Sequence, residues 1–275
     1  MSSAAVSPQV GIAILGAGKL GEALLSGLLR SGHDPGDVQV SVRRPERGAE
    51  LTKRHGVRAV ENAEAAVTAQ VILLAVKPQD MPALLTDIAA SVHPGQLVIS
   101  MAAAVTTKTI EAALPAKTPV VRVMSNTPVL VDEAMSAISA GAHATEEHLT
   151  RVEALLAPVG RTVRVPEYQQ DAVTALSGSG PAYFFYLVEA MIDAGILLGL
   201  PRAVAADLIV QTAVGAAVML RETGEHPVIL REAVTSPGGT TINAIRELEN
   251  HGVRAALLAA LEAARDRARE LGASQ

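Results

Sequence analysis

The sequence predicts an α/β protein: a doubly wound, mostly parallel sheet, followed by an all-helical C-terminal domain. Three observations predict this class. Short runs rich in β-branched residues alternate with helix-like segments up to about residue 165. A glycine-rich string directly follows the first of these runs. Beyond residue 166 the pattern becomes Ala/Leu-rich and helix-periodic, with glycine or proline at the breaks.

The expected strands are continuous apolar runs, which are typical of strands buried on both faces of a parallel sheet. They lie at residues 10–15, 38–42, 71–76, 97–100 and 120–124, with shorter candidates at 135–140 and 162–165. Helices are expected between them at 18–30, 45–55, 81–91, 107–114 and 146–157. The later helices are expected at 171–200, 203–222, 228–233, 241–250 and 253–272. We therefore divide the chain near Pro166, into domains 1–165 and 166–275.

Composition restricts the classes of function. Of the 275 residues, 49% are hydrophobic and 19% are charged, the net charge is −5, and there is no cysteine. A mild, unclustered negative charge argues against nucleic-acid binding, and the lack of cysteine excludes disulfides and thiolate metal sites. Residues 1–10 lack the features of a signal peptide, and no continuous apolar run approaches the ~18 residues of a membrane helix. We expect a cytoplasmic protein that binds neither a membrane nor a metal.

Several of the C-terminal helices are apolar on more than one face, as at residues 208–220. A helix that is buried all round needs additional partners, which favours a homo-oligomer. A large intramolecular bundle is the alternative.

A Gly-Ala-Gly-Lys-Leu-Gly string separates the first expected strand from the first expected helix. In this context Gly16 permits the tight turn, Gly18 lets the backbone approach a pyrophosphate, and Gly21 allows close helix–strand packing. Backbone N–H groups at the start of the helix, around Lys19 and Leu20, suit the phosphates. The string predicts a Rossmann-type dinucleotide-binding domain, and an ordinary βα turn is the alternative.

The end of the second expected strand indicates which dinucleotide binds. NAD enzymes usually place Asp or Glu there, whereas this chain has Arg43 and Arg44. Guanidinium groups form charge-assisted, often bidentate, hydrogen bonds with a 2′-phosphate. We therefore expect NADPH as cofactor, with NADH used at lower efficiency. The alternative is that one of the two arginines is merely solvated.

Turns that follow other strands should line the same cleft, because ligands of open α/β sheets bind beyond the carboxyl ends of the strands. We assign to the cofactor the residues Asn62, Ala75, Val76, Lys77, Pro78, Met101, Ala102 and Ala103. The small side chains after the strand at 97–100 leave room for a nicotinamide ring.

Two loops in the helical half differ from generic helix connections. The first reads Ser-Gly-Ser-Gly-Pro-Ala-Tyr from Ser177, and the second reads Thr-Ser-Pro-Gly-Gly-Thr-Thr from Thr235. The segment from Ala233 through the second loop resembles the signature of pyrroline-5-carboxylate reductases. The motifs that start at Ala75 and Arg122 also resemble that family at matching spacings, so the resemblance covers nearly the whole chain.

Three positions depart from the family pattern. The family commonly has proline at Ser125, glycine at Ala104 and a polar residue at Ala233. The last departure touches function, because a cofactor contact that some relatives make from this position cannot be made by alanine.

The resemblance implies the NADPH-dependent reduction of 1-pyrroline-5-carboxylate to L-proline, the final step of proline biosynthesis. This imino-acid substrate carries a carboxylate beside a ring imine. Backbone N–H groups at the start of the helix near residue 240 form a receptor for such a carboxylate. We assign to the substrate Ser236, Gly238, Gly239, Thr240 and Thr241. The alternative is a simple helix start with threonine as N-cap.

The reaction needs no strong acid, because a cyclic imine can arrive protonated or take its proton from a hydroxyl group or water. Thr241 is the first candidate for holding the ring nitrogen, and Thr174 is the second, with a water plausible between them. The resemblance also places Glu167 near the substrate, where it could stabilise an iminium. An exposed loop carboxylate is the alternative interpretation of Glu167.

Other functions remain open at this point. The enzyme alternatives are an imine reductase for other rings and a 3-hydroxyacid dehydrogenase of the same two-domain plan. Such dehydrogenases typically carry a lysine early in the long helix after the Rossmann domain, and residues 171–200 contain none. A non-catalytic NADP-binding protein is the alternative from another class. The resemblance implies assembly as a homodimer or a larger ring of dimers.

Overall fold

The computed structural model describes residues 10–273, so residues 1–9, where the absence of a signal peptide was expected, lie outside it. The chain forms two compact units. The first contains the chain up to Ser179 together with the residues from Ala264 onward, and the second is Gly180–Ala263. The division near Pro166 assigns a separate function to each part and stays a prediction.

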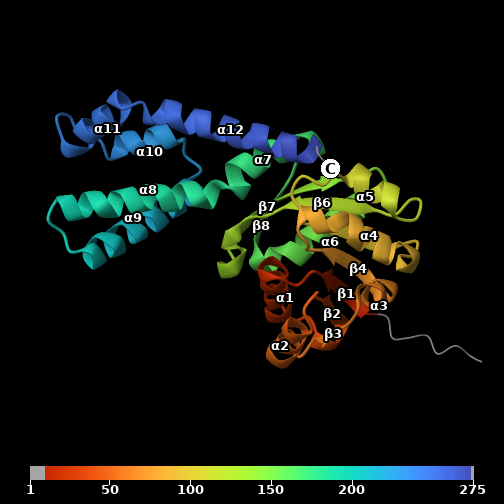
Figure 1. Ribbon diagram of the computed structural model, residues 1–275. Coiled ribbons are helices and arrows are strands. Elements are labelled where there is room, and N and C mark those ends of the chain that lie inside the picture. The colour runs from red at the N-terminus through yellow and green to blue at the C-terminus, as the bar shows by residue number, and fades with distance from the viewer. Residues whose placement is uncertain (1–9, 274–275) are drawn as a thin grey trace, which may run out of the picture. The chain divides into compact units, whose positions relative to one another are not determined.

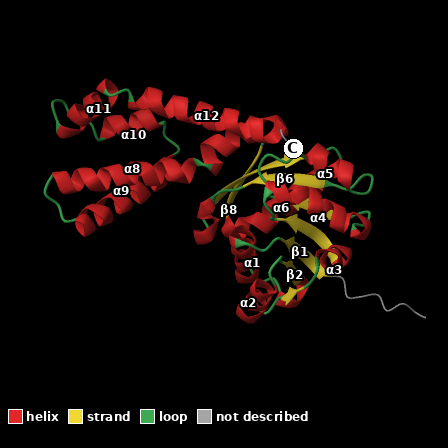
Figure 2. Cartoon of the chain, viewed as in Figure 1, coloured by secondary structure: helices red, strands yellow, loops and turns green. Residues whose placement is uncertain are grey.

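An eight-stranded sheet forms the centre of the first unit (Figure 1, Figure 2). Its strands are β1 Val10–Leu15, β2 Val38–Ser41, β3 Arg58–Ala59, β4 Ala69–Leu74, β5 Leu97–Ser100, β6 Val120–Met124, β7 Ala134–Ala140 and β8 Gly160–Arg164. Their order across the sheet is β3-β2-β1-β4-β5-β6-β7-β8. Neighbouring strands are parallel except for the antiparallel pair β6 and β7. The predicted doubly wound, mostly parallel sheet is therefore confirmed.

Helices cover both faces of this sheet. Buried residues of α1 (Lys19–Arg30), α2 (Pro45–His55) and α6 (Glu146–Leu156) pack on one face. Those of α3 (Asn62–Thr68), α4 (Met81–Ile88) and α5 (Thr107–Ala113) pack on the other. Neither β3 nor α3 was predicted, because two exposed strand residues and a seven-residue helix carry too little periodicity to recognise.

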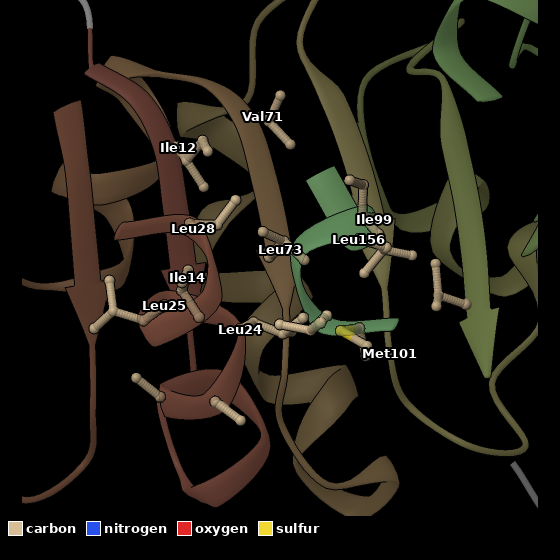
Figure 3. Close-up of a cluster of buried hydrophobic side chains, with 14 of the residues drawn as sticks. Ile12, Ile14, Leu24, Leu25, Leu28, Val71, Leu73, Ile99, Met101 and Leu156 are labelled. Atoms are coloured by element: carbon tan, nitrogen blue, oxygen red, sulfur yellow. The ribbon is translucent and has the colours of Figure 1, made fainter. Parts of the chain in front are cut away.

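The side chains of β1 alternate between the two faces of the sheet, which explains why the strands are continuous apolar runs in the sequence. Ile12 and Ile14 enter the core on the α1 side, where they meet Leu25 and other leucines (Figure 3). Ala13 and Leu15 enter the core on the opposite face. Since successive side chains of a strand point to opposite faces, a sheet covered twice needs an apolar residue at every position.

One backbone conformation bears on Ala104, a position where the chain departs from the pattern of the family that it resembles. Ala104 has a φ of 62°, in the left-handed region where glycine carries no steric penalty. An alanine there costs about 1 kcal/mol relative to a relaxed conformation. The conformation therefore favours glycine, the residue that the resemblance implies for this position.

The second unit is helical throughout. It contains α8 (Gly180–Leu197), α9 (Arg202–Thr223), α10 (Pro227–Ala233), α11 (Thr240–Asn250) and the part of α12 (Val253–Ala273) up to Ala263. Helices α8 and α9 lie side by side (Figure 1). A Cβ on Gly195 would lie 2.8 Å from the Cβ of Ala205, so this pair of small residues lets the two helices approach closely.

Both long helices expose large apolar side chains. These include Phe184, Phe185, Tyr186, Met191, Leu208, Val210, Val214 and Met219. By length and composition, Glu167–Leu197 and Arg202–Thr223 could each cross a membrane, and only 6% of the apolar stretch of each is buried within the chain. Apolar surface of this extent marks a contact with another molecule.

Candidate functional site

The glycine-rich turn after β1 is held between the ends of β2 and β4, the two strands that flank β1. The N–H groups of Gly16 and Ala17 donate to the carbonyl oxygen of Ser41, at 2.9 and 3.0 Å, where β2 ends. Gly16 has a φ of 88°, and a Cβ there would lie 2.5 Å from Cγ1 of Val76, just after β4. Only glycine fits this turn, because both the backbone conformation and the space exclude a side chain.

Helix α1 begins directly after this turn with its N-terminus uncapped. Gly18 is the N-cap and supplies no side-chain hydrogen bond, so no capping side chain occupies the N–H groups of the first turn, at Lys19 and Leu20. A Cβ on Gly21 would lie 3.2 Å from the Ile14 side chain, which explains the third glycine. An uncapped N-terminus behind a close backbone turn suits a pyrophosphate.

The two arginines predicted to recognise a 2′-phosphate are exposed at the end of β2. Arg43 donates from Nη1 to Oδ1 of Asp80 at 3.2 Å. Arg44 is the N-cap of α2 by its backbone, and its guanidinium has no partner among residues 10–273. Both cations are available to an anion at this edge. Asp80 was not foreseen, although it directly follows the recognised motif that starts at Ala75.

Glu22 on α1 joins this helix to α2, the helix that follows Arg43 and Arg44 in the chain. Its carboxylate accepts hydrogen bonds from Arg47, from Arg54 at 2.7 Å and from His55 at 3.0 Å, all on α2. Burial by itself would raise the pKa of Glu22, but the hydrogen bonds from these three side chains and the charge of Arg47 outweigh burial and lower the pKa to about 2. The cluster ties α1 to α2.

Glu22 is expected to make the protein lose stability in acid. A carboxyl whose pKa is lowered by folding contributes stability above its unfolded pKa, near 4.5, and loses it as the pH falls towards 2. We expect Glu22→Gln to lower the free energy of unfolding by about 1–2 kcal/mol at pH 7, since solvent screens part of the cluster. Urea titrations between pH 7 and pH 2 measure the difference. A difference between wild type and variant that stays constant over this range contradicts the interpretation.

The other residues assigned to the cofactor follow the ends of β4 and β5. The N–H of Ala75 donates to the carbonyl oxygen of Leu15 at 2.8 Å, and Lys77 is exposed beyond it. Met101 and Ala102 are buried directly after β5. The remaining ones, Val76, Pro78 and Ala103, are half-buried in the same turns. All of them lie at the carboxyl edge of the sheet, and their contacts with cofactor stay predictions.

Asn62 lies at the start of α3 and is engaged on both sides. Its Oδ1 accepts a hydrogen bond from the Ser41 hydroxyl at the end of β2, and its Nδ2 donates to Asp87 at 2.8 Å. The side chain is thereby held next to the strand end that carries the arginines.

Glu167 is not an exposed loop carboxylate, so that alternative is wrong. Its two oxygens accept hydrogen bonds from the backbone N–H and the hydroxyl of Thr107, both at 2.7 Å, at the start of α5. Arg122, buried on β6, lies 3.4 Å from the same carboxylate. Its partners make Glu167 an anchor between α5 and the chain that leaves β8. A catalytic role for it stays a prediction.

Thr174 begins a π-helical turn, Thr174–Gly178, within the helix that was expected to be continuous from 171 to 200. Its hydroxyl donates to the carbonyl oxygen of Gln170 at 2.8 Å. A Cβ on Gly178 would lie 2.5 Å from Met124, so the turn packs closely against the end of β6. Such π-bulges frequently occur at functional sites.

Asn126 holds this turn and was not among the predicted site residues. Its amide nitrogen donates to the carbonyl oxygen of Ser177 at 3.2 Å, and its amide oxygen accepts from the N–H of Met135 at 3.0 Å. Asn126 lies in the motif that starts at Arg122, and Ser177 begins the first of the two unusual loops. Their places in these two motifs are the signal that could have paired them.

The second loop leads into α11 without a side-chain cap. Gly239, not a threonine, is the N-cap, so the alternative of a threonine-capped helix start is wrong. Gly238 has a φ of 67°, and the N–H of Gly239 donates to Ser236 at 3.1 Å. The hydroxyls of Thr240 and Thr241 make no hydrogen bond within the described chain. Backbone donors and two hydroxyls are therefore free at one helix N-terminus.

The predicted site residues are divided between the two compact units. The cofactor residues, Glu167 and Thr174 belong to the first unit, and the loop from Ser236 to Thr241 belongs to the second. Within residues 10–273, no group of three or more His, Cys, Asp or Glu side chains could hold a metal ion. That the protein uses no metal stays a prediction.

Two family models match the chain. Residues 167–271 match the model described as pyrroline-5-carboxylate reductase dimerisation. Residues 11–104 match the model described as NADP oxidoreductase coenzyme F420-dependent. The first match covers the helical half and indicates oligomerisation, and the second covers the part of the sheet from β1 to β5.

Individual relatives resemble the chain over nearly its whole length. A pyrroline-5-carboxylate reductase of Corynebacterium melassecola is 45% identical over 265 residues, which cover 95% of this chain and 98% of the relative. The structure of one from Coxiella burnetii has a TM-score of 0.89 at 37% identity, over 96% of this chain and 98% of that one. A Plasmodium falciparum pyrroline carboxylate reductase with NADP bound has a TM-score of 0.85 at 26% identity, with the same coverage.

Proposed function

The chain belongs to the pyrroline-5-carboxylate reductase family, and on this premise we propose that it reduces 1-pyrroline-5-carboxylate to L-proline with NADPH. The observation that carries the substrate assignment is the uncapped start of α11, where the backbone N–H groups and the hydroxyls of Thr240 and Thr241 are free within the described chain. This chemistry matches a substrate with one carboxylate and one ring nitrogen. The reaction is the last step of proline biosynthesis.

The residues at the carboxyl edge of the sheet fit NADPH. The turn at Gly16 leaves no room for a side chain, and the start of α1 is uncapped, as a pyrophosphate requires. In the proposal Arg43 and Arg44 bind the 2′-phosphate. NADPH supplies the hydride that reaches the imine carbon, and the protein supplies position and charge.

The substrate loop orients the imine in the proposed mechanism. N–H groups at the start of α11 hold the carboxylate, and the Thr241 hydroxyl holds the ring nitrogen. The proton on that nitrogen comes with the substrate or from a hydroxyl or water, for which Thr174 is the second candidate. Glu167 acts through the elements it anchors, because protein donors already occupy both of its oxygens.

We further propose that the protein works in the cytoplasm as a homodimer or a ring of dimers. The exposed apolar sides of α8 and α9 form the interface, and the match to the dimerisation model over 167–271 favours a protein partner over a membrane. Asp193 and Asp207 place charges within the apolar sequences of α8 and α9. Charged side chains of this kind also suit a protein partner better than lipid. Domain 1–165 binds the cofactor, and domain 166–275 binds substrate and partner.

The proposed reaction is tested by following NADPH oxidation with purified protein. We expect turnover with 1-pyrroline-5-carboxylate, less with piperideine-6-carboxylate, and no oxidation of a 3-hydroxyacid in the presence of NADP. Tight cofactor binding without turnover of either imine contradicts the proposal and favours a non-catalytic NADP-binding protein. Preference for the six-membered ring contradicts only the substrate.

The role of Thr241 is tested by Thr241→Val, which keeps the shape and removes the hydroxyl. We expect kcat/KM for the imine to fall by about 10-fold, from the loss of one hydrogen bond, while the Kd for NADPH stays near wild type. Steady-state kinetics and NADPH titration measure the two quantities. Thr86→Val, on α4, is the control and should leave both unchanged. Equal losses in NADPH binding and in turnover argue against a substrate role.

A further inference from the structure

The ion pair between Arg43 and Asp80 crosses the cofactor edge of the sheet. Arg43 follows β2 and Asp80 follows β4, and the strand order places β1 between these two strands. The glycine turn that begins at Gly16 leaves the same end of β1. The pair therefore joins the two strand ends that flank this turn.

The two partners differ in their freedom to move. The side chain of Arg43 is 81% exposed, whereas that of Asp80 is 28% exposed. Asp80 is also confined by its backbone, whose N–H donates to the carbonyl oxygen of Lys77 at 2.9 Å. The arginine can swing away, and the carboxylate stays at the edge.

The Asp80 carboxylate is not used by its own helix. Asp80 is the N-cap residue of α4, but its backbone has helical angles, with φ of −92° and ψ of −10°, and its side chain makes no capping bond. A capping side chain normally needs an extended backbone at this position. The carboxylate is therefore left to Arg43.

We propose that Asp80 is a specificity-determining residue that competes with the 2′-phosphate of NADPH for Arg43. The proposal rests on the proposed function, in which Arg43 recognises that phosphate. NADPH must separate the pair before it gains the arginine, so part of its binding energy is lost. NADH carries no 2′-phosphate and leaves the pair intact. Asp80 thus weakens the preference for NADPH and lets NADH be used.

The test is the variant Asp80→Asn, which keeps the size and removes the charge. An exposed ion pair is worth less than a tenfold change, so we expect the ratio of kcat/KM for NADPH to that for NADH to rise by about 2- to 5-fold. The change should lie in the KM for NADPH, with the NADH constants unchanged. It should shrink between about 50 and 500 mM salt, because an exposed pair is screened. A purely structural effect would move both cofactors together at every salt concentration.

Two further variants complete the experiment. Glu64→Gln is the control, because it removes a carboxylate from another exposed ion pair, the one between Glu64 and Arg58. It should leave the ratio of kcat/KM for the two cofactors unchanged. In the Arg43→Ala background, Asp80→Asn should change the ratio less than it does in the wild type, because the arginine for which Asp80 and the phosphate compete is gone. An equal effect in both backgrounds, or an unchanged or lowered ratio in Asp80→Asn alone, overturns the proposal.

Binding measurements separate this inference from the proposed function. Titration of the nicotinamide fluorescence gives the Kd of each cofactor without any imine. If the wild type reduces no imine, the proposed function fails, and the ratio of the two Kd values still tests Asp80. If the wild type is active and the ratio does not respond to Asp80→Asn, only the role of Asp80 fails.

Discussion

A double variant, Arg43→Ala with Arg44→Ala, is expected to lose most of the preference for NADPH over NADH. Each charge-assisted hydrogen bond to the 2′-phosphate contributes about 1.5–3 kcal/mol, so the loss of two corresponds to about 10²-fold or more. Both guanidiniums are exposed directly after β2, at the position where NAD enzymes usually carry Asp or Glu. The ratio of kcat/KM for the two cofactors measures the effect.

The single variants and a control refine this result. Arg58→Ala removes an exposed arginine of the same unit and should leave the cofactor ratio unchanged. Arg44→Ala alone removes a cation that has no partner among the described residues, whereas Arg43→Ala also frees Asp80. If the double variant keeps the wild-type ratio, neither arginine recognises the phosphate and the basis for NADPH preference is wrong.

Association through the helical unit is expected to be required for activity. The interface proposed for α8 and α9 should bury ~2,000 Å² or more, as in obligate homodimers. Val214→Asp places a charge in the middle of the apolar side of α9, where Val214 is 52% exposed in the single chain. An unpaired charge cannot be buried without a cost of several kcal/mol, so the variant should dissociate and lose activity.

Light scattering and activity on dilution test this expectation together. The wild type should have a mass of at least twice the 28.4 kDa of one chain. Val67→Asp places the same charge on α3, where the valine is 45% exposed, and should change neither mass nor activity. A fully active wild-type species near 28 kDa would refute an obligate oligomer.

The sequence by itself determined the architecture of both halves. Buried strands such as β1 are apolar at every position because helices cover both faces of the sheet, and this leaves a local signal. Gly16 and Gly21 were readable because a backbone that needs positive φ or close packing admits few residue types. The elements that were missed, β3 and α3, are short and were positioned by their neighbours.

Only the tertiary structure decided which side chains meet. Asp80 pairs with Arg43 from 37 residues away, and Glu167 pairs with Thr107 from 60 residues away. The strand order brings such residues together, and no periodicity in the sequence records it. The N-cap of α11 likewise fell on Gly239, because the backbone of the preceding turn sets where the helix begins. Residue types therefore indicated the chemistry of the site in advance, whereas its pairings depended on the fold, since long-range contacts leave no local pattern.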